Sequence, residues 1–175
     1  MRRKKLTGFS LIEVVLGMAL FAMLMVTVNM VLLDGFKAAR RTEALNRVKA
    51  DGAVVLDKIS KEIEFSSGID NCAVTTSSDT LTLTRPDDAG TEVTYALSGT
   101  TVVMTTVAGG TAAISSSGVI FSHYTPDCPT MFVCTPRAVT ICFGADVASG
   151  ADVSDTASNS GGLKFYNTVV RKNNL

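Results

Sequence analysis

An apolar run from Phe9 to Leu33 constrains this chain more than any other feature of its sequence. The run holds 25 residues, which as a helix span roughly 37 Å at about 1.5 Å per residue, enough to cross a bilayer core of about 30 Å. One charge, Glu13, lies inside it. A carboxylate at the bilayer centre costs roughly 2.5–3.5 kcal/mol and less near the edge, so Glu13 is expected to be functional and to have a partner.

The flanks of the run predict its orientation. The segment 1–8, MRRKKLTG, carries four basic residues, and a long polar chain follows the run. This asymmetry predicts a cytoplasmic N-terminus and a C-terminal domain across the membrane. An ordinary secretory signal has an apolar core of about 7–15 residues and an A-x-A-like site after it, and neither is found here. A simple single-pass anchor explains the length but neither Glu13 nor the Gly8–Phe9 junction.

The string KKLTGFSLIEVVLGMALFAMLMV resembles the N-terminus of type IV prepilins and of type II secretion pseudopilins. In that family a dedicated membrane peptidase cuts after the glycine that ends a basic leader. The new first residue is N-methylated, and a glutamate stands at the fifth mature position. The resemblance therefore implies cleavage between Gly8 and Phe9, N-methylation of Phe9 and an assembly role for Glu13.

The residues at this junction also suit such chemistry. Gly8 has no side chain, so an extended backbone can enter a protease cleft closely. Cleavage creates a positive amine on Phe9, and in a helical assembly Glu13 can face the amine of a neighbouring subunit. The alternative is that Glu13 only extends to the membrane interface.

The resemblance also implies the partners and the location. The partners are a prepilin peptidase and methylase, sister pilins or pseudopilins, an inner-membrane assembly platform, and membrane lipid before assembly. The chain is then expected in the inner membrane as a single-pass protein and afterwards in a pilus or pseudopilus.

Charge and composition favour an envelope protein. The formal charge is zero, but removing the leader leaves 12 basic and 16 acidic side chains, a charge of −4. No basic stripe remains for nucleic acid. The length of 175 residues predicts one globular domain plus the anchor, and the chain has no Trp. The expected divisions are a leader 1–8, a transmembrane or filament-core helix 9–33, an amphipathic continuation 34–65 and a β-rich head 66–175.

The helix is predicted to continue to Phe65. Apolar residues recur at helical spacing, charged residues occupy the other faces, and Ser66-Ser67-Gly68 predicts the end of the helix. Gly35 and Gly52 each weaken a helix by up to about 1 kcal/mol relative to Ala. The expected apolar stripe consists of Leu45, Val48, Val55, Leu56, Ile59 and Ile63.

From Ile69 the pattern changes to a period of two, which predicts strands. Ser98-Gly99 predicts a tight hairpin turn, and 86–90 and 108–110 predict two more turns. Local pairing implies mostly antiparallel strands, so the expected fold class is α+β, a long helix packed on an antiparallel sheet. The candidate strands are Thr80–Thr84, Glu92–Leu97, Thr101–Thr106, Gly118–Tyr124, Arg137–Phe143 and Gly162–Val170.

The head carries a looser resemblance. The order LTLTR, VTYALSG, GVIFSHY, TPRAVTI and TVVRKNNL resembles the globular domain of J-type minor pseudopilins and W-type minor pilins. Their C-terminal Arg-Asn matches only approximately, at 171–174.

The cysteines all follow the apolar run, in a compartment that is oxidising if it is a periplasm. Four cysteines allow three pairings, and the sequence does not choose among them. The favoured expectation pairs Cys128 with Cys134 and Cys72 with Cys142. No C-x-x-C occurs, so zinc and other cofactors are not expected.

Catalysis is not expected either. The only histidine, His123, is expected to be a structural strand residue, which leaves little room for a Ser-His-Asp or Cys-His site. Asp87 and Asp88 are typical of a turn. The segment Ala145–Gly162 is typical of a flexible exposed loop, whose Asp146, Asp152 and Asp155 could ligate calcium although their spacing matches no EF-hand.

These observations predict a minor structural subunit of a type IV pilus or type II secretion pseudopilus, and no enzyme. The alternatives are a major pilin and a membrane-anchored extracytoplasmic binding domain that never polymerises. The sequence does not distinguish pilus, secretion and DNA-uptake systems.

Overall fold

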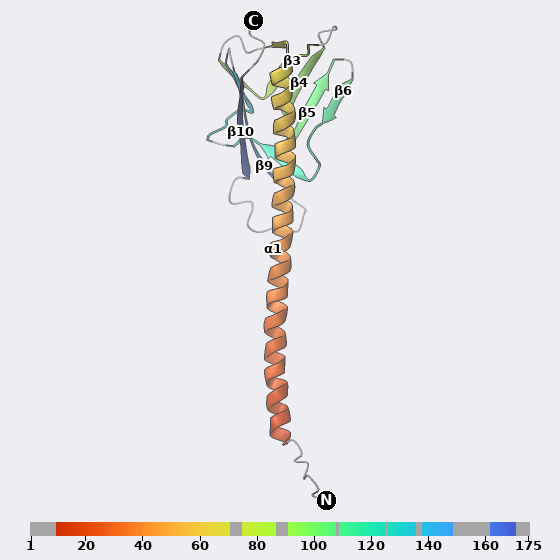
Figure 1. Ribbon diagram of the computed structural model, residues 1–175, viewed down its shortest axis with the longest axis vertical. Helices are drawn as coiled ribbons and strands as arrows, with labels where there is room; N and C mark the ends of the chain where they lie inside the picture. Colours follow the sequence, from red (N-terminus) through yellow and green to blue (C-terminus); the bar gives the residue numbers. More distant parts are fainter. Residues whose placement is uncertain are drawn as a thin grey trace, which may run out of the picture. The chain divides into compact units, whose positions relative to one another are not determined.

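The structure is a computed structural model that describes residues 10–70, 75–86, 91–107, 109–124, 126–135, 138–148 and 162–170. It confirms the α+β class, with one long helix followed by antiparallel strands (Figure 1). The chain divides into two compact units, Met1–Arg41 and Thr42–Leu175. The predicted divisions at residues 33 and 65 remain predictions.

Helix α1 runs from Leu11 to Phe65. Ser10 precedes it, and its carbonyl accepts the N–H groups of Glu13 at 3.0 Å and Val14 at 3.3 Å. The helix ends at the predicted Ser-Ser-Gly stop, where the Ser66 hydroxyl donates to the Ile63 carbonyl at 2.9 Å. The Ser66 hydroxyl therefore satisfies one of the carbonyl groups that the last turn of a helix leaves without a partner.

The second unit contains the end of α1 and two sheets. One sheet has the order β1-β3-β4-β5-β6 and the other the order β10-β9-β8-β2, with β7 also paired to β9. The described pairs are all antiparallel. The strands are β1 Gly68–Ile69, β2 Thr76–Ser78, β3 Thr80–Thr84, β4 Glu92–Ser98, β5 Thr101–Thr106, β6 Gly110–Ala113, β7 Val119–Ser122, β8 Phe132–Cys134, β9 Ala138–Val147 and β10 Leu163–Val170.

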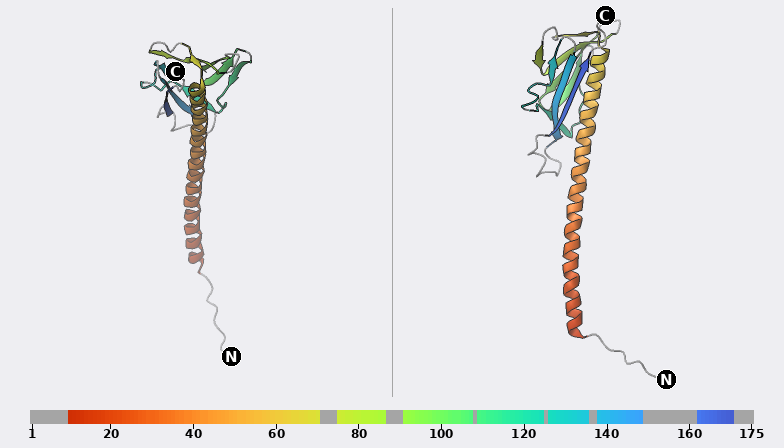
Figure 2. Two further views of the ribbon diagram at one scale, coloured as in Figure 1. Left: turned by 45° about the horizontal axis from the view of Figure 1, so that its top comes forward. Right: turned by 60° about the vertical axis from the view of Figure 1, so that its left-hand side comes forward.

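Within this unit the helix lies across both sheets. β9 and β10 lie to one side of its axis and β3 to β6 to the other (Figure 1), and both sheets lie on the same side of the helix in the right-hand view of Figure 2. The helix residues that become buried are Val48, Gly52, Val55, Ile59 and Ile63, spaced by three or four. Four of these belong to the predicted stripe, while Leu45 and Leu56 are half-buried.

The strand predictions were correct in the main and wrong at several ends. Strands β3 and β5 have the predicted bounds, and Gly99 forms the β4–β5 turn at φ 62°. β7 ends at Ser122, before the predicted Tyr124, and β9 runs on to Val147, into the segment predicted as a loop. The sequence analysis missed β1, β2, β6 and β8, which have two to four residues, because such lengths show no period.

Aromatic residues organise the core. The Phe143 ring lies 5.4 Å from the Phe121 ring and 5.3 Å from the Phe165 ring, centroid to centroid. Tyr95 is fully buried, and its hydroxyl donates to the Met104 sulfur at 3.5 Å. Burial raises the pKa of Tyr95 to about 12, and the carboxylate of Glu62 adds to the shift, so the phenol stays neutral at physiological pH.

An ion pair joins the end of α1 to the first sheet. Arg85 donates through Nη2 to Glu62 Oε1 at 2.6 Å and through Nε to Glu62 Oε2 at 3.1 Å. This bidentate geometry fixes orientation as well as charge. It holds the last turns of the helix against the chain just after β3.

Gly52 packs directly on β10, and we expect Gly52→Ala to destabilise the head. A Cβ at this position would overlap the ring of Phe165, which is stacked on Phe143. Overpacking of this kind costs about 1–3 kcal/mol, and the gain in helix propensity offsets at most about 1 kcal/mol. The measurement is urea unfolding of the full chain in detergent, followed by near-UV circular dichroism.

Gly35→Ala is the matched control, because a Cβ at Gly35 meets nothing within 4 Å. It should leave stability unchanged or raise it slightly. Combining Gly52→Ala with Phe165→Leu should recover part of the loss. Equal effects of Gly52→Ala and Gly35→Ala would show that the Phe165 contact is unimportant.

Candidate functional site

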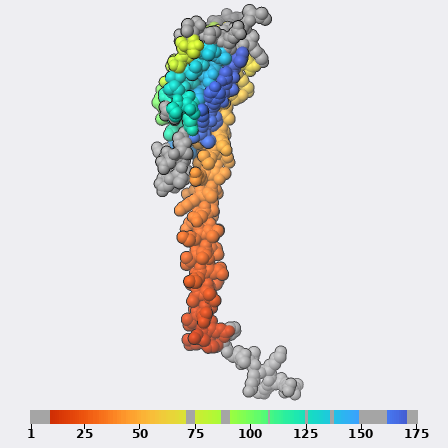
Figure 3. All heavy atoms as spheres, turned by 90° about the vertical axis from the view of Figure 1, so that its left-hand side faces the viewer, coloured from red at the N-terminus to blue at the C-terminus, as the bar shows by residue number. Residues whose placement is uncertain are grey.

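The first unit presents an apolar helical surface. Every residue from Ser10 to Arg41 is exposed, including large apolar side chains such as Leu11, at 83 %, and Met23, at 74 %. Figure 3 draws one face of this stretch, coloured from red to orange. Among the described residues, α1 is the one helix long and apolar enough to cross a membrane by length and composition. A core helix of a soluble protein would pass the same test but would be buried, and this stretch is not.

Two polar residues of the apolar run bond back to the helix itself. Thr27 Oγ1 donates to the Leu24 carbonyl at 2.8 Å, and Asn29 Nδ2 donates to the Met25 carbonyl at 2.9 Å. In hydrocarbon an unsatisfied polar group is costly, so these local bonds make both residues compatible with lipid. The sequence analysis did not weigh them, although Thr and Asn are known to bond to carbonyls one turn earlier.

Glu13 lies in the first turn of α1, where a negative charge is favoured by the helix dipole. Ser10 and Glu13 also have the S-x-x-E spacing of a capping box, a pattern that the sequence analysis overlooked. A local role for Glu13 at the helix start therefore exists beside the predicted assembly role, and an experiment has to separate them. The predicted cleavage residues Gly8 and Phe9 lie outside the described part of the chain.

In the second unit, the segment between β7 and β8 covers the face of β9 that points away from the core, here called the outer face. β10 pairs along one edge of β9, while β7 and β8 share the other edge, opposite Gly144–Val147 and Val139–Ile141. The chain between them, residues 123–131, is here called the strap. Cys128 in the strap is disulfide-bonded to Cys142 of β9, with their Cα atoms 5.6 Å apart.

This disulfide corrects the favoured pairing of Cys128 with Cys134 and of Cys72 with Cys142. Cys134 lies opposite Val139 and packs in the core, whereas Cys142 alternates with the core residues Ile141 and Phe143 and therefore faces away. Cys128 and Cys134 are therefore on opposite faces of the sheet. Cys134 is itself disulfide-bonded, and Cys72 lies outside the described residues.

Polar contacts, together with the disulfide, hold the strap against β9 and β10. Lys164 Nζ of β10 lies 2.8 Å from Asp127 Oδ2 and 5.5 Å from the centre of the Tyr124 ring. The Cys128 N–H donates to the Tyr124 carbonyl at 2.7 Å, which closes the strap on itself. The outer face of β9 is consequently covered by its own chain.

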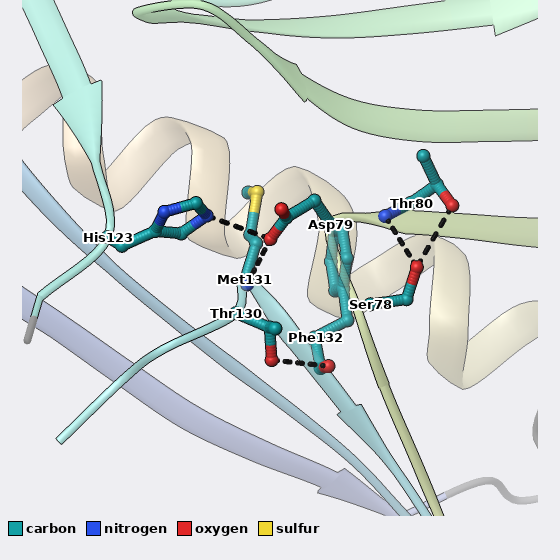
Figure 4. Close-up of polar contacts among 7 residues, drawn as sticks. All are labelled: Ser78, Asp79, Thr80, His123, Thr130, Met131 and Phe132. Atoms are coloured by element: carbon teal, nitrogen blue, oxygen red, sulfur yellow. Dashed lines mark hydrogen bonds and ion pairs between the residues drawn. The ribbon is translucent and has the colours of Figure 1, made fainter. Parts of the chain in front are cut away.

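His123 and Asp79 tie the strap to the crossover between the two sheets (Figure 4). Asp79 connects β2 to β3, and its Oδ1 lies 2.8 Å from His123 Nε2 and accepts the Met131 N–H at 3.1 Å. His123 follows β7 instead of lying within it, so the predicted strand position was wrong. Its contact with Asp79 joins the end of β7 to the junction of β2 and β3.

The remaining candidates do not form a site within the described residues. Asp146 belongs to β9, and its Oδ1 accepts the N–H of Val147 at 2.7 Å. Asp87, Asp88, Asp152 and Asp155 lie outside the described residues. Among the described residues, no group of three or more His, Cys, Asp or Glu side chains could hold a metal ion.

Comparison with known proteins identifies the N-terminal segment. Residues 3–29 match the family described as the prokaryotic N-terminal methylation motif. The match covers most of the basic leader, the Gly8–Phe9 junction, Glu13 and most of the apolar run. No curated protein and no solved structure matches the chain.

Proposed function

We propose that this chain, whose N-terminal motif is that of the type IV pilin and pseudopilin family, is a structural subunit of a type IV pilus or type II secretion pseudopilus. The observation that carries the proposal is the match over residues 3–29 on a helix whose apolar surface is exposed from its first turn. The motif implies processing by a prepilin peptidase and assembly with other pilins, and it suggests a structural and not an enzymatic role.

Processing prepares the helix for assembly. Cleavage after Gly8 removes four basic residues and leaves a positive amine on Phe9. Glu13 lies four residues further on, about 6 Å along a helix. In an assembly of parallel helices offset along their axes, Glu13 can pair with the amine of a neighbouring subunit. That pairing offsets the cost of burying the carboxylate among apolar side chains.

Before assembly the apolar run is held in the inner membrane, with the leader in the cytoplasm and the head outside. Assembly then moves the helix into a core of neighbouring helices, where its exposed apolar side chains pack. The head, stabilised by the disulfide between Cys128 and Cys142, faces outward. Its looser resemblance to J-type pseudopilins and W-type pilins favours a minor subunit over a major pilin.

The test is the mass of the mature N-terminal peptide. We expect a peptide that begins with N-methylated Phe9 when the chain is expressed with its prepilin peptidase, and an unprocessed leader when the peptidase gene is deleted. An intact Met1 in the assembled form contradicts the proposal, as does cleavage near residue 20, which is typical of an ordinary secretory signal.

A further inference from the structure

A basic face follows the apolar run on α1. Lys37, Arg40 and Arg41 are exposed and spaced by three and four residues, so they lie on one side of the helix. We call these three residues the collar. Asp34 is the acidic residue one turn before them, and the formal charges of these four side chains sum to +2. All four residues belong to the first unit, in the same helix as the exposed apolar surface.

The spacing between the collar and Glu13 matches the thickness of a bilayer. From Glu13 to Lys37 the helix rises about 36 Å at about 1.5 Å per residue. A hydrocarbon core is about 30 Å thick, and a bilayer with its headgroups about 40–45 Å. When Lys37 lies among the headgroups on one side, Glu13 therefore reaches the headgroup border on the other.

We propose that the collar binds the phosphate groups of phospholipids in the outer leaflet and so fixes the depth of the helix before assembly. This inference rests on the membrane-anchored stage of the proposed function. Guanidinium groups pair with phosphate bidentately and an ammonium pairs as a point charge, so Arg40, Arg41 and Lys37 suit the ligand. Long basic side chains also reach headgroups while their stems stay in apolar surroundings.

The depth that the collar sets determines the position of Glu13 in the membrane before assembly. An outward step of one turn, about 5.4 Å, draws Glu13 into hydrocarbon and lifts the collar away from the phosphates. An inward step brings the collar toward the hydrocarbon. Both displacements are unfavourable, so the helix keeps its register until a neighbour's amine offers Glu13 a partner and the collar releases its lipid.

A single tryptophan can report this depth, because the natural chain contains none. Leu33, exposed in the last turn of the apolar run, is replaced by Trp in the full chain. The protein is reconstituted into phosphatidylcholine vesicles that contain phosphatidylglycerol. Quenching is compared between lipids that carry a spin label near the headgroup and lipids that carry it near the bilayer centre. The test variant is the triple substitution Lys37→Gln, Arg40→Gln and Arg41→Gln.

With the collar intact, we expect the headgroup-side label to quench the introduced tryptophan more strongly. Each basic residue near an anionic surface shifts the equilibrium between the surface-bound and the displaced helix about fivefold, so loss of three changes it on the order of a hundredfold. Without the collar, only the basic leader holds the helix, at the opposite surface of the bilayer. The helix should therefore shift toward the leader's side, which moves the tryptophan toward the bilayer centre by up to one turn, about 5 Å. The matched control removes three charges from the second unit, by Lys49→Gln, Lys58→Gln and Lys61→Gln, and should show no shift.

An unchanged depth in the collar variant overturns the inference, and so does an equal shift in the control. Both results leave the proposed function intact, since the tryptophan is still quenched from within the bilayer. If lipid-borne quenchers have no effect on any variant while an aqueous quencher does, the helix is not in the membrane, and the proposed function fails together with the inference.

Discussion

Glu13→Ala should reduce incorporation of the chain into filaments by about ten- to a hundredfold, the effect of losing a charge-assisted contact of about 1.5–3 kcal/mol. The carboxylate is the only charge between Leu11 and Leu33, and its proposed partner is the amine of a neighbour's first residue. Membrane insertion should persist, because removing the acid lowers the cost of burial. The measurement is the amount of the variant in sheared filaments, or co-purified with sister pilins.

Glu13→Gln separates assembly from helix capping. Gln preserves the capping-box pattern with Ser10 but carries no charge. If charge is what recruits the subunit, Glu13→Gln should fail as Glu13→Ala does, while Glu43→Ala, an exposed acid further along the helix, should assemble normally. Normal incorporation of Glu13→Gln would falsify the ionic role. Degradation of Glu13→Ala to the same extent as Gly8→Ala would indicate a trafficking defect.

Replacing both Cys128 and Cys142 with Ser should lower the free energy of unfolding of the head by about 3 kcal/mol, the loop-closure value for a loop of about 15 residues. The bond closes a sequence separation of 14 and anchors the strap to β9. The measurement is guanidinium unfolding of the chain from Asp34 onward, which contains the whole second unit.

Asp127→Asn is the control on the same strap. It removes the exposed ion pair with Lys164, which is worth about 0–1 kcal/mol at such a site. Peptide mapping without reductant should join Cys128 to Cys142. Thr76 of β2, four residues after Cys72, lies opposite Cys134, and we therefore expect Cys72 and Cys134 to be joined. A peptide that links Cys128 to Cys134 would contradict the structure.

The sequence was sufficient to predict the elements whose signal is periodic. The helix from the apolar run to Phe65 was predicted from spacing, and the turn at Gly99 from a hairpin signal. Both depend on interactions between residues a few positions apart. Strands of two to four residues, such as β2 and β8, gave no such signal, because they are too short to show a period and are defined by pairing with other strands, β2 with β8 and β8 also with β9.

The disulfide and the role of Gly52 depend on contacts between distant residues. Cys128 is closer in sequence to Cys134 than to Cys142, and only the alternation of side chains in β8 and β9 shows that Cys134 faces the core. The sequence predicted only that Gly52 weakens the helix, and its packing against Phe165, more than a hundred residues later, explains why a side chain does not fit there. No local pattern carries this information.

Photo-crosslinking from the apolar helix tests the central claim most directly. A photoreactive amino acid replaces Leu20, which is exposed in the first unit, in cells that express the sister pilins. We predict adducts between this position and the N-terminal helix of another pilin, and their loss when Glu13→Gln is combined with the probe. A chain that is stably present in the membrane but forms no adduct with any pilin would contradict the account and identify an anchored domain that does not polymerise.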